Sequence, residues 1–276
     1  MTTVPTSQAS PSAGTRDGLS SSVRHWLISI ASIGLSLIVW HVVATSIVRD
    51  PVLLPGPLAT VGVLIRYLHT PYPADGDTLI GHALVSMARV LAGFAAGSVI
   101  GIAIGALMAG IRGFRAMVDP FIEITRPLPP LAFVPVLIVW FGIGEAPKII
   151  LIAAGVVPVM AISTAAGLDG VSKDMLNCAR CLGASEAYAM LHVRIRAAMP
   201  QIITGMRLSV GLSWTSIVAV EMIAATAGLG FVILQAGQFL NTSLIFSGIL
   251  IIAALGLAID AALRRLQRHL DPTMRP

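Results

Sequence analysis

The sequence predicts an all-α integral membrane protein with six transmembrane helices. Hydrophobic residues make up 56% of the chain and charged residues only 11%, whereas roughly a quarter of the residues in soluble domains are charged. Several uncharged runs approach or reach the about 20 residues that cross a bilayer. A soluble core has no room for this much apolar surface, so a membrane-embedded helical fold follows.

Positive charge is concentrated on one side of the predicted spans. The formal net charge is +5, which by itself is compatible with nucleic-acid binding. However, most of the 18 Lys and Arg residues fall in tails and loops that the spans place on a single face. Such a bias marks the cytoplasmic face. We therefore expect both termini in the cytoplasm and no nucleic-acid partner.

The N-terminal quarter divides into a tail, a span and an interfacial segment. Residues 1–22 are rich in Ser, Thr, Pro and Gly and predict a disordered cytoplasmic tail. Residues 23–78 hold the first span, Trp26–Val48, then a proline-punctuated external loop. The amphipathic segment Leu58–His69 that follows is expected to lie in the membrane interface.

The second span, Leu84–Ile111, carries glycine at every fourth position, at Gly93, Gly97, Gly101 and Gly105. This spacing places the four glycines on one helix face. A second helix can approach closely where side chains are missing. The row therefore predicts helix packing rather than a ligand site.

The third span, Phe121–Gly142, follows a short internal loop at Arg112–Arg115 and is broken by prolines, among them Pro127, Pro129 and Pro130. Each proline removes a backbone donor and clashes with the preceding turn. Non-helical backbone at membrane depth is tolerated where it is buried in protein or lines a cavity. This span is therefore a candidate lining of a pathway, and a simple kink is the alternative.

The fourth and fifth spans are predicted at Ile149–Leu168 and Ile202–Ala224. The uncharged stretch Met222–Ile259 has 38 residues, which as one helix would be about 57 Å long and too long to cross once. Gly and Asn-Thr-Ser signals divide it into an external re-entrant segment at 228–241 and the sixth span at 243–263.

A polar island, Lys173–Arg207, separates the fourth and fifth spans and carries five Lys or Arg residues. Its pattern of a helix, Gly183 and a second helix is typical of a surface that meets a soluble partner on the cytoplasmic side. We therefore expect the membrane-spanning core of the protein at 79–270. Within it we expect a cytoplasmic loop at 169–201, which holds most of the polar island, and a cytoplasmic tail follows at 271–276.

Catalytic and metal-binding signatures are missing from the sequence. It lacks the G-x-x-x-x-G-K-[ST], H-E-x-x-H and G-x-S-x-G patterns. Cys178 and Cys181 form a Cys-x-x-Cys pair, but only His192 is nearby as a further ligand. We expect no catalytic residue and no metal site, and we expect both cysteines to act as small apolar residues on a helix face.

Glu221 is the clearest ionisable residue within a predicted span. Such a residue is costly at membrane depth and indicates function by default. Three alternatives remain: it lines a pathway or gate, it pairs with Arg89 or Arg126, or it lies in a dimer interface. Arg126 attracts an anionic solute or simply anchors the topology. Trp214 is expected to pack or to lie at the interface.

Segments spread over about residues 50–270 resemble the nitrate/sulfonate/taurine-type permeases of ABC importers. In chain order they are Leu53–Pro57, Ser86–Phe94, Asp119–Pro120, Arg126–Ala132, Trp140–Glu145, Leu182–Ser185, Ala198–Pro200, Thr204–Arg207, Val220–Ile223 and Gly228–Gly230. Any one segment is weakly specific, but their order and spacing together are specific.

The resemblance implies a type I importer permease whose cytoplasmic EAA loop couples it to an ATPase. The coupling residues would be Asn177, Cys178, Ala179, Arg180, Leu182, Gly183, Ala184, Ser185 and Pro200. The pathway or gate candidates would be Arg126, Pro127, Pro129, Pro130, Trp214, Glu221 and Met222. The acidic residue that begins the EAA motif is replaced here by Asn177, so one contact made by that carboxylate would be missing.

The resemblance also implies the partners and the location. A second copy of the permease, two ATP-binding subunits and a periplasmic or lipid-anchored binding protein would complete the importer in a bacterial inner membrane, in contact with lipid. ATP and Mg²⁺ would bind in the ATPase, so this chain would hold no cofactor. The transported solute would be a small anion of the nitrate, sulfonate, taurine, bicarbonate or aromatic-acid class. The alternative is a secondary transporter that works without ATP.

Overall fold

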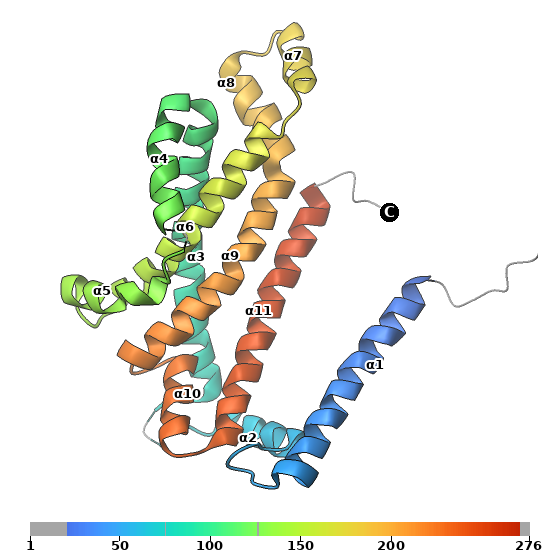
Figure 1. The fold of residues 1–276 in the computed structure, drawn as a ribbon, viewed down its shortest axis with the longest axis vertical. Coiled ribbons are helices and arrows are strands. Elements are labelled where there is room, and N and C mark those ends of the chain that lie inside the picture. Colours follow the sequence, from blue (N-terminus) through green and yellow to red (C-terminus); the bar gives the residue numbers. More distant parts are fainter. Residues whose placement is uncertain (1–20, 75, 126, 271–276) are drawn as a thin grey trace, which may run out of the picture. The chain divides into compact units, whose positions relative to one another are not determined.

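The computed structural model describes residues 21–74, 76–125 and 127–270. Residues 1–20 of the predicted tail at 1–22, the predicted tail at 271–276 and the candidate residue Arg126 lie outside the described residues. Residues 21 and 22 already belong to a helix, so the predicted end of the N-terminal tail is wrong. Every regular element within the described part of the chain is a helix (Figure 1). The chain divides into two compact units, residues 1–57 and 58–276.

The first unit contains one apolar helix. Helix α1 (Ser21–Val42) continues as a π-helical turn, η1 (Val43–Val48). Its segment Leu27–Val48 has the length and composition of a membrane span. The helix ends at Arg49, which has a left-handed backbone with φ of 57°.

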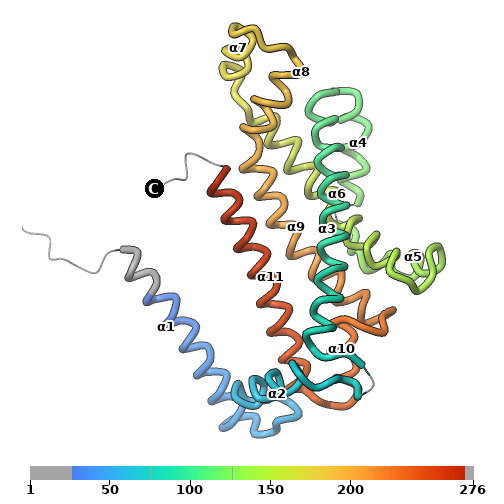
Figure 2. Tube along the Cα trace, turned by 180° about the vertical axis from the view of Figure 1, so that it is seen from behind, coloured from blue at the N-terminus to red at the C-terminus, as the bar shows by residue number. Residues whose placement is uncertain are grey.

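The second unit contains the remaining elements. They are α2 (Pro57–His69, starting at the boundary), α3 (Leu79–Gly110), α4 (Arg112–Thr125), η2 (Pro130–Phe133), α5 (Val134–Phe141), α6 (Ala146–Asp169), α7 (Lys173–Cys181), α8 (Glu186–Tyr188), η3 (Ala189–Arg194), α9 (Ile195–Ala224), α10 (Leu229–Gln238) and α11 (Thr242–Leu270). Helices α7 and α8 lie at one end of this unit and α10 lies at the other (Figures 1 and 2).

Five helices among the described residues are long and apolar enough to cross a membrane, and the bent pair α4–α5 makes a sixth candidate span. The axis turns by 91° between α4 and the segment Pro130–Phe141. The prolines between the two helices account for the break, because they cannot continue a regular helix. The predicted re-entrant segment at 228–241 contains α10.

Several predicted boundaries are wrong. Helix α9 begins at Ile195 rather than Ile202, and α11 continues to Leu270 rather than ending at 263. Helix α3 begins at Leu79, before the predicted Leu84, because the Thr78 side chain accepts a hydrogen bond from the backbone N–H of Gly81 and caps the helix. The predicted loop at Arg112–Arg115 is the first turn of α4, and only Ile111 separates it from α3. Charge at these positions reflects an amphipathic helix end rather than a loop.

The glycine row of α3 lies against a matching row on α6. A Cβ added at Gly93, Gly97, Gly101 or Gly105 would lie 2.5–2.7 Å from the Cβ of a residue on α6. Those partners are Ile152, Val156, Met160 and Thr164, which also repeat every fourth residue. Both rows rise together along the chain, so α3 and α6 run parallel, and the missing side chains allow their backbones to approach.

Helix α6 is central to the second unit because it packs against α3 on one side and α9 on the other (Figure 2). The largest apolar cluster joins these helices through buried residues such as Val90, Ile152, Met160, Ile202 and Ile217. This packed frame holds the polar groups at both ends of α6 in fixed positions.

Candidate functional site

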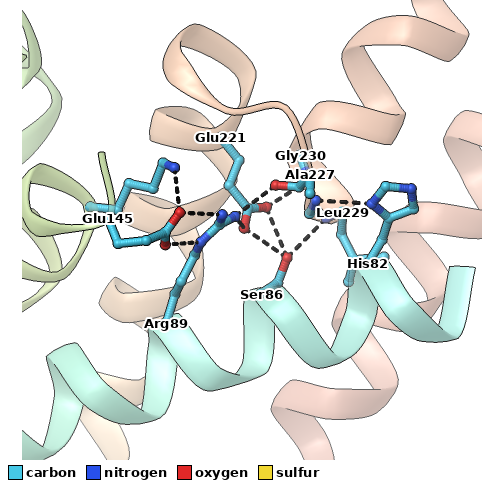
Figure 3. Close-up of polar contacts among 10 residues, drawn as sticks. His82, Ser86, Arg89, Glu145, Glu221, Ala227, Leu229 and Gly230 are labelled. Atoms are coloured by element: carbon cyan, nitrogen blue, oxygen red, sulfur yellow. Dashed lines mark hydrogen bonds and ion pairs between the residues drawn. The ribbon is translucent and has the colours of Figure 1, made fainter. Parts of the chain in front are cut away.

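A network of charged and polar side chains lies at the α10 end of the second unit (Figure 3). At its centre the guanidinium of Arg89, on α3, donates hydrogen bonds to three separate elements. Its Nε and Nη2 bind the Glu145 carboxylate at 2.6 and 2.7 Å, and its Nη1 binds Glu221 Oε1 at 2.8 Å and the Ala227 carbonyl at 2.6 Å. Arg89 is only 7% exposed. One side chain thus ties α3 to the turn before α6 and to the end of α9.

Glu221 is fully buried and closes the start of α10. It accepts a hydrogen bond from the hydroxyl of Ser86 and one from the backbone N–H of Gly230, at 2.9 Å. The Ser86 hydroxyl accepts the N–H of Leu229 at 2.9 Å. The first N–H groups of a helix have no partner inside the helix and favour negative charge. The carboxylate therefore replaces the water that these groups would otherwise need.

His82 completes the cap of α10. The N–H of Gly228 donates to its Nδ1 at 3.0 Å, and its Nε2 lies 2.9 Å from the Tyr72 carbonyl. The two partners therefore specify the tautomer with hydrogen on Nε2. Gly228 has φ of +123° and passes directly beside the Glu221 carboxylate, where a Cβ would collide. Only glycine fits this backbone position.

Charge in the network is balanced. The buried Lys148 donates to Glu145 Oε1 at 2.9 Å, so two cations face the two carboxylates of Glu145 and Glu221. Glu145 precedes α6 and is half exposed. Hydrogen bonding from Arg89, aided by Lys148 and opposed by partial burial, lowers its pKa to about 2. A lowered pKa means that the stability contributed by Glu145 is complete above its ordinary pKa and is lost only as pH falls towards 2.

This geometry favours one of the three alternatives for Glu221, pairing with Arg89, because every carboxylate oxygen has a partner inside the chain. No solvent reaches it within the second unit. A hydrogen-bonded, charge-balanced network with a buried centre at Arg89 and Glu221 fixes one arrangement of its elements. The network therefore has a structural role: it holds α3, α9 and α10 in fixed positions relative to one another.

A second feature lies at the opposite end, where α7 ends in a tight turn. The N–H of Gly183 donates to the Arg180 carbonyl at 2.9 Å, and the N–H of Ala184 donates to the Ala179 carbonyl at 3.0 Å. With φ of +85° at Gly183, these bonds form a Schellman motif. The turn leaves Leu182 at the tip with 88% of its surface exposed.

The turn is held from both sides. Ser172 caps α7 and Ser185 caps α8, each by accepting a backbone N–H three residues ahead. Arg180 forms an ion pair with Glu186 at 2.8 Å, which ties the end of α7 to the start of α8. Asn177, in the place of the motif's acidic residue, accepts from Arg180 at 3.4 Å. The result is a stiff, exposed tip with an apolar side chain at its end.

Both cysteines are exposed and free. The expectation that they fill a packed helix face is therefore wrong within this chain, because α7 buries no residue. Pro200 lies inside α9, five residues after its first residue. Within the described ranges, no group of three or more His, Cys, Asp or Glu side chains could hold a metal ion.

The structure separates the pathway candidates. A largely apolar cavity of about 460 Å³ lies beside the break between α4 and α5, and Leu128, Pro130, Phe133, Pro158 and Leu212 are among the residues that line it. Pro127 and Pro129 are exposed in the break itself. The remaining candidates, Trp214, Glu221 and Met222, do not line this cavity. Trp214 is buried beside Gly256 of α11, and its indole N–H finds no partner among the described residues.

His82, Ser86, Glu145 and Lys148 belong to the network, but the sequence did not single them out. One local signal was present. His82, Ser86 and Arg89 are spaced four and three residues apart, which places them on one face of a helix. A polar stripe on an otherwise apolar span indicates buried polar partners. The identity of those partners depends on contacts distant in sequence.

Comparisons with known proteins agree with this fold. The taurine transport system permease protein TauC of Escherichia coli (strain K12) is 38% identical over 249 residues, which is 90% of each chain. The bicarbonate transport system permease protein CmpB of Synechococcus elongatus is 34% identical over 248 residues, or 88% of each chain.

The solved structure of the MetNI methionine ABC transporter in an inward-facing conformation superposes with a TM-score of 0.63 at 20% identity, over 70% of this chain and 96% of that chain. The likeness confirms the predicted type I importer permease fold. Residues 97–276 match the family described as "Binding-protein-dependent transport system inner membrane component". The chain belongs to this family of transport permeases.

Proposed function

We propose that the chain is the transmembrane subunit of an ATP-driven importer and that it forms the translocation pathway for a small anion. The observation that carries this proposal is the stiff α7–α8 tip. It presents Leu182 to solvent at one end of the second unit, while the buried ion-pair network locks the other end. An exposed apolar tip on a rigid turn suits a groove in a soluble partner.

The partners proposed are a second copy of this chain, two ATP-binding subunits and a binding protein on the opposite face. The tip would rest on the ATPase in the cytoplasm, where the charge bias also places both termini. ATP and Mg²⁺ would bind in the ATPase, and this chain would have no catalytic role. Closure of the ATPase would push the tip and rock the spans between inward- and outward-facing states.

The proposed substrate class is a small anion such as a sulfonate or bicarbonate. Taurine and bicarbonate appear in the names of two permeases that resemble this chain over 90% and 88% of its length. The cavity beside the broken span is largely apolar. Selection among anions is therefore assigned to the binding protein rather than to this cavity.

Gly183→Val should uncouple the permease from its ATPase. A β-branched residue at φ of +85° would be strained by about 1–3 kcal/mol, so the turn would open and Leu182 would move. We expect the variant to insert normally but to lose the ATPase during purification, or to retain it without regulating hydrolysis. Copurification and ATP hydrolysis measure the effect.

Two controls accompany this experiment. Gly113→Val makes the same change at an exposed helical glycine with open space around it, and it should behave as wild type. The chain purified without its ATPase should not hydrolyse ATP. A Gly183→Val complex with normal composition and normal regulation of hydrolysis would remove the coupling role from this turn.

A further inference from the structure

Asp169, the last residue of α6, is placed where a carboxylate is not expected. The C-terminus of a helix carries partial negative charge, which repels an acidic side chain. Two arginines from other elements offset this repulsion. The Asp169 Oδ2 accepts a hydrogen bond from Arg115 Nη1 of α4 at 2.5 Å, and Oδ1 faces Arg194 Nη2 of η3 at 3.4 Å. Each oxygen of one carboxylate thus holds a different element.

Arg194 also fastens η3 to α6 through the backbone. Its Nε donates to the Leu168 carbonyl at 3.0 Å. This carbonyl lies in the last turn of α6, where it receives no bond from four residues ahead and accepts only the weaker bonds of the helix end. Residues 173–194, here called the coupling segment, comprise α7, α8 and η3. Arg194 is the last residue of this segment, so it joins the segment to the end of α6.

Arg115 lies on the first turns of α4, which leads to the proline break and the cavity. It also forms an ion pair with Asp119 on the next turn, at 3.5 Å. Apolar packing holds α4 to α3 and α6 through Met108, Ile122 and Ala161. The Arg115–Asp169 contact adds a polar link between α4 and the end of α6, next to the coupling segment. Helix α4 lies beside α3, at the same end of the unit as α7 (Figure 2).

We propose that Asp169 is a positioning residue that transmits displacement of the coupling segment to α4 and, through α4, to the broken span. The inference rests on the proposed coupling function. Arg194, Asp169 and Arg115 form a continuous path from the segment to α4, and no other residue among those described bridges the two with both carboxylate oxygens.

The exposure of the path allows its role in transmission to be tested separately from the stability of the fold. The side chains of Asp169 and Arg115 are 38% and 44% exposed. Ion pairs as exposed as these contribute little to the stability of a fold. Removing the carboxylate should therefore leave the helices packed and change only how α4 follows the coupling segment.

Hydrogen exchange measured by mass spectrometry tests this inference in the complete complex with its ATPase. Nucleotide-free complex is compared with complex trapped by Mg-ATP and vanadate. In wild type we expect exchange to change both in residues 173–194 and in residues 112–141. In Asp169→Asn the change in 173–194 should persist, while the change in 112–141 should fall by at least about threefold.

Two further variants make the test specific. Arg115→Gln removes only the α4 side of the link and should reproduce the loss in 112–141, even if Asp169→Asn fails to assemble. Asp260→Asn is the matched control, because Asp260 also binds two arginines, Arg207 and Arg264, at 2.8 and 2.9 Å, but on α11. It should leave the response of α4 and α5 unchanged.

The outcomes separate the two claims. A wild-type complex in which vanadate trapping leaves 173–194 unchanged would contradict the proposed coupling function. A normal response of 173–194 together with an undiminished response of 112–141 in Asp169→Asn or Arg115→Gln would overturn the role of Asp169. An equal loss in Asp260→Asn would overturn it as well, because the effect would then belong to any acidic residue at this end.

Discussion

Glu221→Gln is expected to lower the stability of the assembled permease by about 3–5 kcal/mol, the usual cost of breaking a buried ion pair. The substitution leaves Arg89 and Lys148, both more than nine-tenths buried, with a single carboxylate between them. It also turns an amide donor towards groups that already donate, among them the N–H of Gly230. The thermal unfolding midpoint should fall by roughly 6–20 °C.

The same variant distinguishes a structural lock from a gate. The regulation of ATP hydrolysis per assembled complex should remain near the wild-type value, because the network is satisfied within the chain. Glu186→Gln is a control for the midpoint alone, because Glu186 belongs to the coupling tip: it also pairs with an arginine, but its side chain is 77% exposed, so its midpoint should shift by no more than about 2 °C. If Glu221→Gln left the unfolding midpoint unchanged but altered the regulation of ATP hydrolysis, Glu221 would line the pathway or gate instead of stabilising the fold.

Gly101→Leu is expected to prevent α3 from packing on α6. A Cβ at this position would lie 2.5 Å from the Met160 Cβ and 2.8 Å from the Val157 carbonyl oxygen, so the backbones must separate. Overpacking of a tight core costs up to about 3 kcal/mol and sometimes more. We expect little monodisperse protein by size-exclusion chromatography and no bound ATPase.

Gly110→Leu is the control for this prediction. Gly110 ends the same helix and is exposed, with open space where a side chain would lie, so a leucine there should be tolerated. Gly101→Ala should already destabilise the protein, because the collision begins at Cβ. Normal assembly and activity of Gly101→Leu would show that the row faces lipid in the membrane.

Features that depend on local pattern were predictable from the sequence. Run length and charge placed the spans, the four-residue glycine spacing placed the packing face, and Gly183 placed the turn between two short helices. Helix starts were less predictable. Arg112 and Arg115 suggested a loop, but they begin an amphipathic helix, because charge alone does not distinguish a helix end from a connection.

The partners of buried charges were not predictable, because they lie far apart in sequence. Arg89 and Glu221 are separated by 132 residues, and Arg89 and Glu145 by 56. The sequence left Arg89 and Arg126 as alternative partners for Glu221. The observed pairing with Arg89 depends on the packing of α3 beside α9 and on the glycine at 228, which lets the backbone pass the carboxylate.

The measurement that tests the central proposal most directly is uptake into proteoliposomes that contain the permease and its ATPase, with the binding protein added outside. The probe is whichever of taurine, ethanesulfonate, bicarbonate and nitrate the binding protein holds most tightly. We predict that uptake requires ATP in the lumen of the proteoliposomes, on the side of the ATPase. Uptake should continue when ionophores collapse every ion gradient. Uptake by the permease alone, driven by a gradient and indifferent to ATP, would contradict the proposal and establish a secondary transporter.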